Sequence, residues 1–189
     1  MWVSEKRYYM ACLDLEGRSC LVVCGGPVAV EKASGLLDCG AHVTAVAPEV
    51  VVGLRELPVE IHEREYESAD LDGRFLVIAA TSDTEVNRRV HADAEARSLL
   101  CNVADVAELC GFILPAVFRQ DPLSIAVSTG GASPALAQRI RRELAARYGP
   151  DHAELARSLR ALRPWAKKRF ATYEERRDFF QDLVERALS

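Results

Sequence analysis

The first part of the chain alternates short apolar runs with helical patterns. The runs are rich in β-branched residues, as expected of strands buried on both faces of a sheet. They are SCLVVCG (19–25), AHVTAVAP (41–48), RFLVIAAT (74–81) and LCNVA (100–104). Helical patterns over 28–39 and 83–99 lie between them. Because strands that alternate with helices form parallel sheets with right-handed crossovers, the sequence predicts an α/β fold with a Rossmann-like, doubly wound sheet.

A different pattern begins after residue 110. Two strand-like runs, 111–120 and 123–130, are joined so closely that they predict a β-hairpin. Residues 134–149 then read as a helix with proline at its start and glycine at its end. The remaining residues have a helix-forming composition, with breaks expected near Pro164 and Thr172. We therefore expect a Rossmann-like domain over 1–113, a small α/β segment over 114–149 and a helical C-terminal domain over 150–189.

The composition is typical of a soluble globular protein, with 49% hydrophobic and 28% charged residues in a chain of 189. No apolar run approaches the ~20 residues of a membrane span. The N-terminal stretch lacks the apolar region of a signal peptide, so we expect a cytoplasmic protein without membrane contact. The six cysteines form no CxxC pair and no Cys/His cluster at zinc spacing, which favours free, mostly buried thiols and no metal site.

The charges are unevenly distributed along the chain. Residues 1–130 carry 11 Lys and Arg against 20 Asp and Glu, whereas residues 131–189 carry 13 against 8. The basic C-terminal third is either a set of solvated helix faces or a surface for an anionic partner. Nucleic acid is not expected as that partner, because the pI is ≈ 5.6 and no nucleic-acid-binding motif accompanies the basic residues.

The first apolar run leads into a glycine turn, Cys24-Gly25-Gly26-Pro27-Val28-Ala29. In the dinucleotide pattern G-x-G-x-x-G/A, Gly26 takes the place of the glycine that lets the backbone approach a pyrophosphate. The helix that follows offers N–H groups and its dipole to an anion, and Pro27 presets φ for its first turn. Cys24 replaces the first glycine of the pattern, and we expect it to keep a negative φ.

Two further strand ends carry candidate cofactor ligands. The acidic residue that binds a ribose in dinucleotide sites is expected after the second strand, where the chain reads Pro48-Glu49. Glu49 is either that ligand or a solvated loop carboxylate, so NAD and NADP both stay open, with NAD favoured by the lack of a nearby basic residue. Thr81 follows the third strand at the edge where such sheets bind ligands, and Asp83 is better placed to cap the next helix.

The stretches CNVAD (101–105) and STGGASP (128–134) are the remaining polar strand ends. Asn102 and Asp105 lie at the carboxyl end of a parallel strand, where Asp105 is either a general base or a turn-capping residue. The second stretch is a glycine turn flanked by hydroxyl groups, with Ser133 as the cap of the following helix. Its alternative role is a cradle of N–H and O–H groups for substrate carboxylates.

Taken together, these motifs resemble the siroheme synthase N-terminal family, precorrin-2 dehydrogenases with or without sirohydrochlorin ferrochelatase activity. The resemblance covers about residues 8–150 and depends most on STGGASP and on NVAD after AATSD. It implies NAD-dependent oxidation of precorrin-2 to sirohydrochlorin by a homodimer, with residues 114–149 as the dimerisation and substrate segment. Some members also insert Fe²⁺ at the same cleft.

The resemblance also implies roles for individual residues. Asp105 matches the catalytic aspartate of the family. The expected cofactor contacts are Gly25, Gly26, Pro27, Val28, Pro48, Glu49, Thr81 and Asn102. The expected substrate contacts are Ser128, Thr129, Gly130, Gly131 and Ser133. The eight carboxylates of precorrin-2 would also give the basic C-terminal third a partner.

Three departures from the family pattern qualify this assignment. Cys24 replaces a glycine, Thr129 stands where some relatives have serine, and no methyltransferase domain follows, so we do not expect the fused three-function form. Two alternatives remain beside the dehydrogenase. One is a bifunctional enzyme that also inserts Fe²⁺ into sirohydrochlorin, and the other is a non-catalytic NAD-sensing module.

Overall fold

A computed structural model describes residues 6–188 of the chain. They divide into two compact units, with the boundary between Ile113 and Leu114. The division falls where the sequence changes from alternating strands and helices to a hairpin. Residues 114–149 and 150–189, expected as separate segments, lie in the one second unit.

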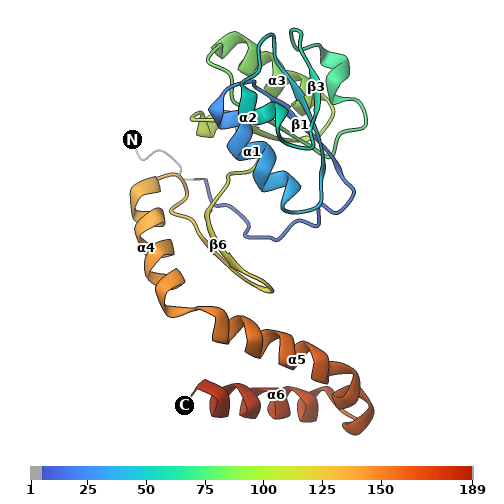
Figure 1. The fold of residues 1–189 in the computed structure, drawn as a ribbon, viewed down its shortest axis with the longest axis vertical. Coiled ribbons are helices and arrows are strands. Elements are labelled where there is room, and N and C mark those ends of the chain that lie inside the picture. The colour runs from blue at the N-terminus through green and yellow to red at the C-terminus, as the bar shows by residue number, and fades with distance from the viewer. Residues whose placement is uncertain (1–5, 189) are drawn as a thin grey trace. The chain divides into compact units, whose positions relative to one another are not determined.

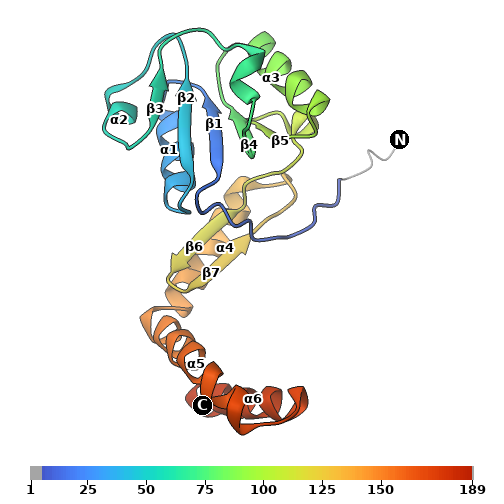
Figure 2. The ribbon, with the colours of Figure 1, turned by 90° about the vertical axis from the view of Figure 1, so that its right-hand side faces the viewer.

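The first unit contains a five-stranded parallel sheet in the order β3-β2-β1-β4-β5 (Figure 2). Its strands are β1 (Ser19–Val23), β2 (His42–Val46), β3 (Glu60–His62), β4 (Leu76–Ala79) and β5 (Leu100–Val103). The strand order reverses at β1, which pairs with β2 on one side and β4 on the other. This sheet confirms the predicted Rossmann-like fold, and ligands of such sheets bind at the reversal, outside the carboxyl ends of the strands.

Helices cover both faces of the sheet (Figures 1 and 2). Cys20 and Val22 point to the face covered by α1 (Pro27–Leu37) and α2 (Val52–Arg55), while Leu21 and Val23 point to the face covered by α3 (Thr84–Ala96). All four side chains are at most 2% exposed. Burial on both faces explains why the central strands read as continuous apolar runs rather than as alternating patterns.

Several short elements were not predicted. Strand β3 and helix α2 have only three and four residues, and the 3-10 helices η1 (Ser68–Leu71) and η2 (Ala107–Leu109) are similarly short. Elements of three or four residues are too short for a pattern to repeat, so the sequence shows no periodic signal there.

The second unit begins with an antiparallel hairpin, β6 (Ala116–Gln120) and β7 (Leu123–Val127), joined by a turn with a cis Asp121–Pro122 peptide. Helix α4 (Pro134–Arg147) packs on it (Figure 2). Helices α5 (Pro150–Arg169) and α6 (Tyr173–Leu188) follow and pack against each other (Figure 1). Strand β6 starts five residues later than predicted, because the amide of Gly111 donates to the carbonyl of Cys101 (2.8 Å) and ties that part of the chain to β5.

The C-terminal helices test the two predicted breaks. The break near Thr172 is confirmed, because α5 ends at Arg169 and α6 begins at Tyr173. The break near Pro164 is wrong, because Pro164 lies inside α5. Pro164 is exposed, so water can satisfy the carbonyl that loses its partner, and the helix continues at the usual cost of an interior proline.

Candidate functional site

The carboxyl edge of the parallel sheet gathers most of the predicted site residues of the first unit. The glycine turn follows β1, Pro48 and Glu49 follow β2, Thr81 follows β4 and Asp105 follows β5. Backbone hydrogen bonds extend the ladder just beyond the strands, from the amide of Ala80 to the carbonyl of Val23 (3.1 Å) and from that of Ala104 to Ala79 (2.9 Å). The four loops therefore leave the sheet at one edge, as the sequence predicted.

The two glycines of the turn have different roles. A Cβ at Gly25 would lie 1.8 Å from the carbonyl oxygen of Glu49, and the Gly25 carbonyl accepts a hydrogen bond from the amide of Val51 (2.9 Å). Gly25 thus lets the loop after β2 pack directly on the turn. A Cβ at Gly26 would meet nothing within 4 Å, so that side of the turn is open. Neither glycine has a positive φ.

Cys24 fits this turn without strain. Among the described residues other than glycine, only Ser98 and Asp105 have a positive φ, so the predicted negative φ of Cys24 is confirmed. Its side chain is 8% exposed and packs in the core between the sheet and α1. A small core residue therefore replaces the first glycine of the dinucleotide pattern. The turn does not need a left-handed residue at this position.

The start of α1 suits the pyrophosphate of a dinucleotide. Gly26 is its N-cap, Pro27 is at its first position, and no side chain caps it or places an acidic group in its first turn. By contrast, Asp83 caps α3 by accepting hydrogen bonds from the amides of Glu85 (2.8 Å) and Val86 (3.2 Å), as expected. An uncapped N-terminus beside an open glycine leaves both the dipole and the space for an anion. These residues fit an NAD(P) cofactor.

Thr81 is held in place by a residue that was not predicted. The amide of Asn87, which is 6% exposed, donates to the Thr81 carbonyl (2.9 Å), and its oxygen accepts from the Thr81 amide (3.2 Å). The Thr81 hydroxyl lies 2.9 Å from both the Asn87 oxygen and the Asp83 carbonyl. Asn87 therefore fixes the turn after β4. The sequence signal that could have revealed this role is a polar residue on the buried side of a helix, since buried polar groups need hydrogen-bond partners.

Asp105 has a left-handed backbone conformation. It is exposed and has φ +62°, in the left-handed region that Asp tolerates better than most residues. Its carboxylate makes no hydrogen bond or ion pair with any residue in the described range 6–188. Residues held in sparsely populated regions cluster at active sites, where the surrounding structure maintains them.

Cys110 is the surrounding residue that maintains the Asp105 turn. Its sulfur lies 3.1 Å from the Val103 carbonyl and 3.3 Å from the Val106 carbonyl, and it accepts from the Val103 amide (3.3 Å). Burial raises the pKa of the Cys110 thiol, which thus keeps the proton that it donates. The thiol joins the residues on both sides of Asp105. The sequence indicated a buried cysteine here but not this role.

Asn102 lies on β5 just before this turn and is 7% exposed. Its side-chain nitrogen donates to the carbonyl of Phe112 (2.9 Å) and lies 3.5 Å from the sulfur of Cys110. Its amide thus also holds the returning chain against β5. A role in cofactor binding stays a prediction for Asn102, as it does for the other residues of the edge.

The predicted substrate residues lie in the second unit, between β7 and α4. Gly130 (φ +63°) and Gly131 (φ +90°) both need the left-handed freedom of glycine. The hydroxyls bind within the loop: that of Ser128 accepts from Gly130 (3.1 Å), that of Thr129 from the Ser133 amide (3.0 Å), and that of Ser133 from Leu136 (3.2 Å). Ser133 caps α4 as expected. The Gly131 amide donates to none of the described residues, so this loop offers an exposed N–H.

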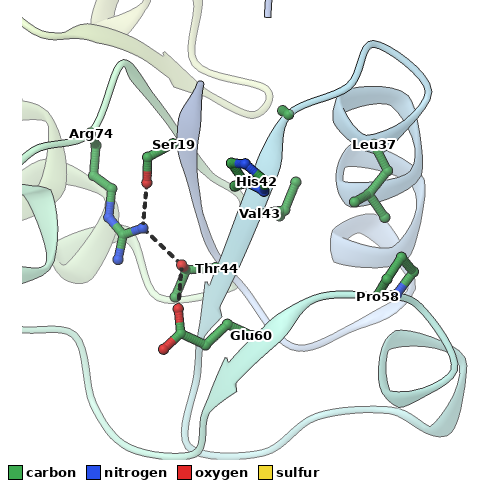
Figure 3. A pocket seen from close by; sticks show the side chains of 9 residues that line it. Ser19, Leu37, His42, Val43, Thr44, Pro58, Glu60 and Arg74 are labelled. Atoms are coloured by element: carbon green, nitrogen blue, oxygen red, sulfur yellow. Dashed lines mark hydrogen bonds between the residues drawn. The ribbon is translucent and has the colours of Figure 1, made fainter. Parts of the chain in front are cut away.

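A pocket of about 430 Å³ lies at the opposite, amino edge of the sheet (Figure 3). Arg74 reaches across it and donates to the hydroxyls of Ser19 and Thr44, both at 2.8 Å, and the Thr44 hydroxyl donates to Glu60 (3.1 Å). These bonds tie β1, β2, β3 and the segment before β4 together. Since sheets of this kind bind ligands at their carboxyl edge, we assign this pocket a structural role.

No group of three or more His, Cys, Asp or Glu side chains within residues 6–188 is placed to hold a metal ion. In the same range, no helix has both the length and the apolar character needed to cross a membrane.

Two family profiles match the chain. One, described as putative NAD(P)-binding, matches residues 11–116, and the other, described as sirohaem biosynthesis protein central, matches residues 120–147. The first covers the sheet with its carboxyl-edge loops. The second covers most of the hairpin and helix α4.

Individual relatives agree with these profiles. The chain is 41% identical to the siroheme synthases of Methylobacillus flagellatus, over 92% of its length, and of Chromobacterium violaceum, over 96%. It spans only 38% and 40% of the length of those two proteins. The solved structure of SirC, a precorrin-2 dehydrogenase, superposes with a TM-score of 0.80 at 30% identity, covering 96% of this chain and 93% of that one.

Proposed function

Because the chain belongs to the siroheme synthase N-terminal (precorrin-2 dehydrogenase) family, we propose that it oxidises precorrin-2 to sirohydrochlorin with NAD⁺. The observation that carries the proposal is the exposed, left-handed Asp105 at the carboxyl edge of an NAD(P)-binding sheet. Cys110 binds the backbone on both sides of Asp105, so the turn presents an exposed carboxylate at this edge, which supports a chemical role.

The oxidation removes two hydrogens from the macrocycle, one as a hydride and one as a proton. Bound NAD⁺ supplies the hydride acceptor. Asp105 is the proposed general base that takes the proton on its carboxylate oxygen. A carboxylate without a partner among the described residues is suited to this task, because it is free to approach the substrate.

The open side of Gly26 and the uncapped start of α1 support the binding of the pyrophosphate. We propose Pro27 and Val28 as further contacts, since Val28 is 42% exposed at the first turn. Glu49 is proposed to bind the adenosine ribose, because its loop packs on Gly25 and its side chain is exposed. A carboxylate favours the free hydroxyl of NAD over the phosphate of NADP.

In the second unit, the loop 128–133 is proposed to bind substrate carboxylates through the exposed N–H of Gly131 and the hydroxyls around it. The hairpin supports a homodimer. Although α4 packs on the hairpin, no residue of β6 or β7 is fully buried, so the hairpin keeps surface that a partner can cover. A second copy of the chain is the proposed partner of this hairpin.

The test follows NADH absorbance with precorrin-2 and NAD⁺. The Asp105→Asn variant should lower kcat by about 10²–10⁴-fold with NAD⁺ affinity unchanged, because Asn tolerates the same φ but cannot take a proton. Glu108→Gln, another exposed carboxylate of the same loop, is the matched control and should keep full turnover.

Full turnover of Asp105→Asn would refute the role of Asp105. NAD⁺ binding by the native protein without any turnover would instead favour the NAD-sensing alternative. The same preparations, given sirohydrochlorin and Fe²⁺ without oxygen, measure whether iron insertion exceeds the uncatalysed rate.

A further inference from the structure

A groove of about 780 Å³ runs along the seam between α5 and α6. The two helices pack against each other (Figure 1). The groove is lined mainly by cationic and apolar side chains. The cations are Arg163 and Lys167 of α5 and Arg176 and Arg177 of α6, and the apolar side chains are Tyr173, Phe180 and Val184. Its volume is within the range of small-molecule sites.

Two of the four cations have no partner within the described part of the chain. Arg163 and Lys167 are exposed, lie one turn apart on one face of α5, and make no ion pair or hydrogen bond with any residue of the described range. Like charges at this spacing repel each other. Across the groove, Arg176 donates to the Phe170 carbonyl (2.9 Å) and Arg177 pairs with Asp178 (2.7 Å). The α5 side therefore carries uncompensated positive charge.

Aromatic surface lies beside these charges. The side chain of Tyr173 is 67% exposed at the start of α6. Phe180 meets Phe179 edge-on, with ring centroids 5.4 Å apart, and Phe179 in turn contacts Trp165 and Phe170 at the bend. That cluster packs α5 against α6 and includes Phe180, one of the two aromatic side chains that line the groove. Exposed aromatic surface rimmed by charge is typical of a binding site.

We propose that the α5–α6 groove binds a tetrapyrrole, with the conjugated ring against Tyr173 and Phe180 and peripheral carboxylates on Arg163 and Lys167. The identification of the ligand as a tetrapyrrole rests on the proposed function, whereas the groove and its charges are observed in the structure. A flat apolar ring with carboxylates on its edge matches an apolar wall with cations on its rim. Nucleic acid matches less well, because Glu185 also lines the groove and the whole chain has a net charge of −4.

The experiment titrates the full chain with uroporphyrin, a stable porphyrin with eight carboxylates, and follows its fluorescence. Affinity should fall in the order uroporphyrin, coproporphyrin with four carboxylates, and protoporphyrin with two. The double variant Arg163→Ala/Lys167→Ala should weaken uroporphyrin binding roughly tenfold, because two exposed ion pairs are lost. Tyr173→Ala should weaken all three porphyrins.

The matched control is Arg160→Ala/Lys168→Ala, which removes the same charge from the same helix outside the groove. It should bind uroporphyrin as the native chain does, and salt at about 0.5 M should weaken the native chain more than the groove variant. Equal losses in both double variants would overturn the proposal, as would complete competition by an oligonucleotide at lower concentration than uroporphyrin.

The proposed function is tested separately. Asp105→Asn should bind uroporphyrin in the groove as tightly as the native chain even though its turnover is lost. Failure of the dehydrogenase assay with an intact carboxylate-dependent porphyrin affinity would thus overturn only the proposed function. Normal turnover with no difference between the two double variants would overturn only the groove.

Discussion

At the scale of the residue, the adjacent glycines Gly25 and Gly26 have different roles that substitutions can distinguish. Gly25 is required by packing, since its Cβ would collide with the Glu49 carbonyl, whereas Gly26 faces open space in a conformation that alanine also adopts (φ −86°, ψ −171°). The first glycine is therefore structural, and the second is available to a ligand. Cys24 beside them is a core residue.

Alanine substitutions should separate these two roles. Gly25→Ala should lower the free energy of unfolding by about 1–3 kcal/mol, the cost of overpacking. Gly26→Ala should leave it unchanged and weaken NAD⁺ binding by about 2 kcal/mol, roughly thirtyfold, by pushing the pyrophosphate away from N–H donors. Chemical denaturation and NAD⁺ titration measure the two effects. If Gly26→Ala binds NAD⁺ like the native chain, the proposed approach of the pyrophosphate is wrong.

At the scale of the element, the turn from β5 to η2 presents Asp105 because one thiol holds both of its sides. Cys110 and Cys101 are both buried cysteines of the same core, but only Cys110 makes side-chain hydrogen bonds within the described residues. This difference offers an internal control for the positioning of Asp105.

Cys110→Ala removes the partner of the Val103 amide, while the Val103 carbonyl still accepts from the Val106 amide (3.3 Å). The unpaired amide should cost about 1–3 kcal/mol of stability, and the loosened turn should lower kcat at least about tenfold. Cys110→Ser keeps a donor and an acceptor and should restore most of kcat. Cys101→Ala should reduce stability through the lost core volume but leave kcat unchanged. Unfolding curves and NADH-coupled turnover measure these effects. A similar loss of kcat in both alanine variants would show that general core damage, not the turn, limits the activity.

At the scale of the whole molecule, the hairpin is the part of the chain that a second copy would complete. The Phe118–Ile125 pair lies on its more covered face, while Ser124 and Ala126 are exposed on the other. If the homodimer forms through the exposed face that carries Ser124 and Ala126, a charge introduced on that face should dissociate it.

Ala126→Glu should raise the dimer dissociation constant more than about a hundredfold, because an unpaired carboxylate would be desolvated at the interface. Ala92→Glu, on the exposed side of α3, makes the same change in the other unit and should leave the dimer intact. Light scattering over a dilution series measures both. A dimer that survives Ala126→Glu does not use this face.

The sequence by itself determined the parallel sheet, the carboxyl-edge loops and the hairpin, because strands buried on both faces must be continuous apolar runs and turns need their own residue types. It also predicted that the glycine turn, Asp105 and STGGASP lie in loops that follow strands. Only the tertiary structure decided why Gly25 is glycine, that Asn87 and Cys110 hold Thr81 and Asp105, that α5 passes through Pro164, and that two cations of α5 face an aromatic groove. Those features depend on contacts between residues distant in sequence or on solvent exposure, which no local pattern records.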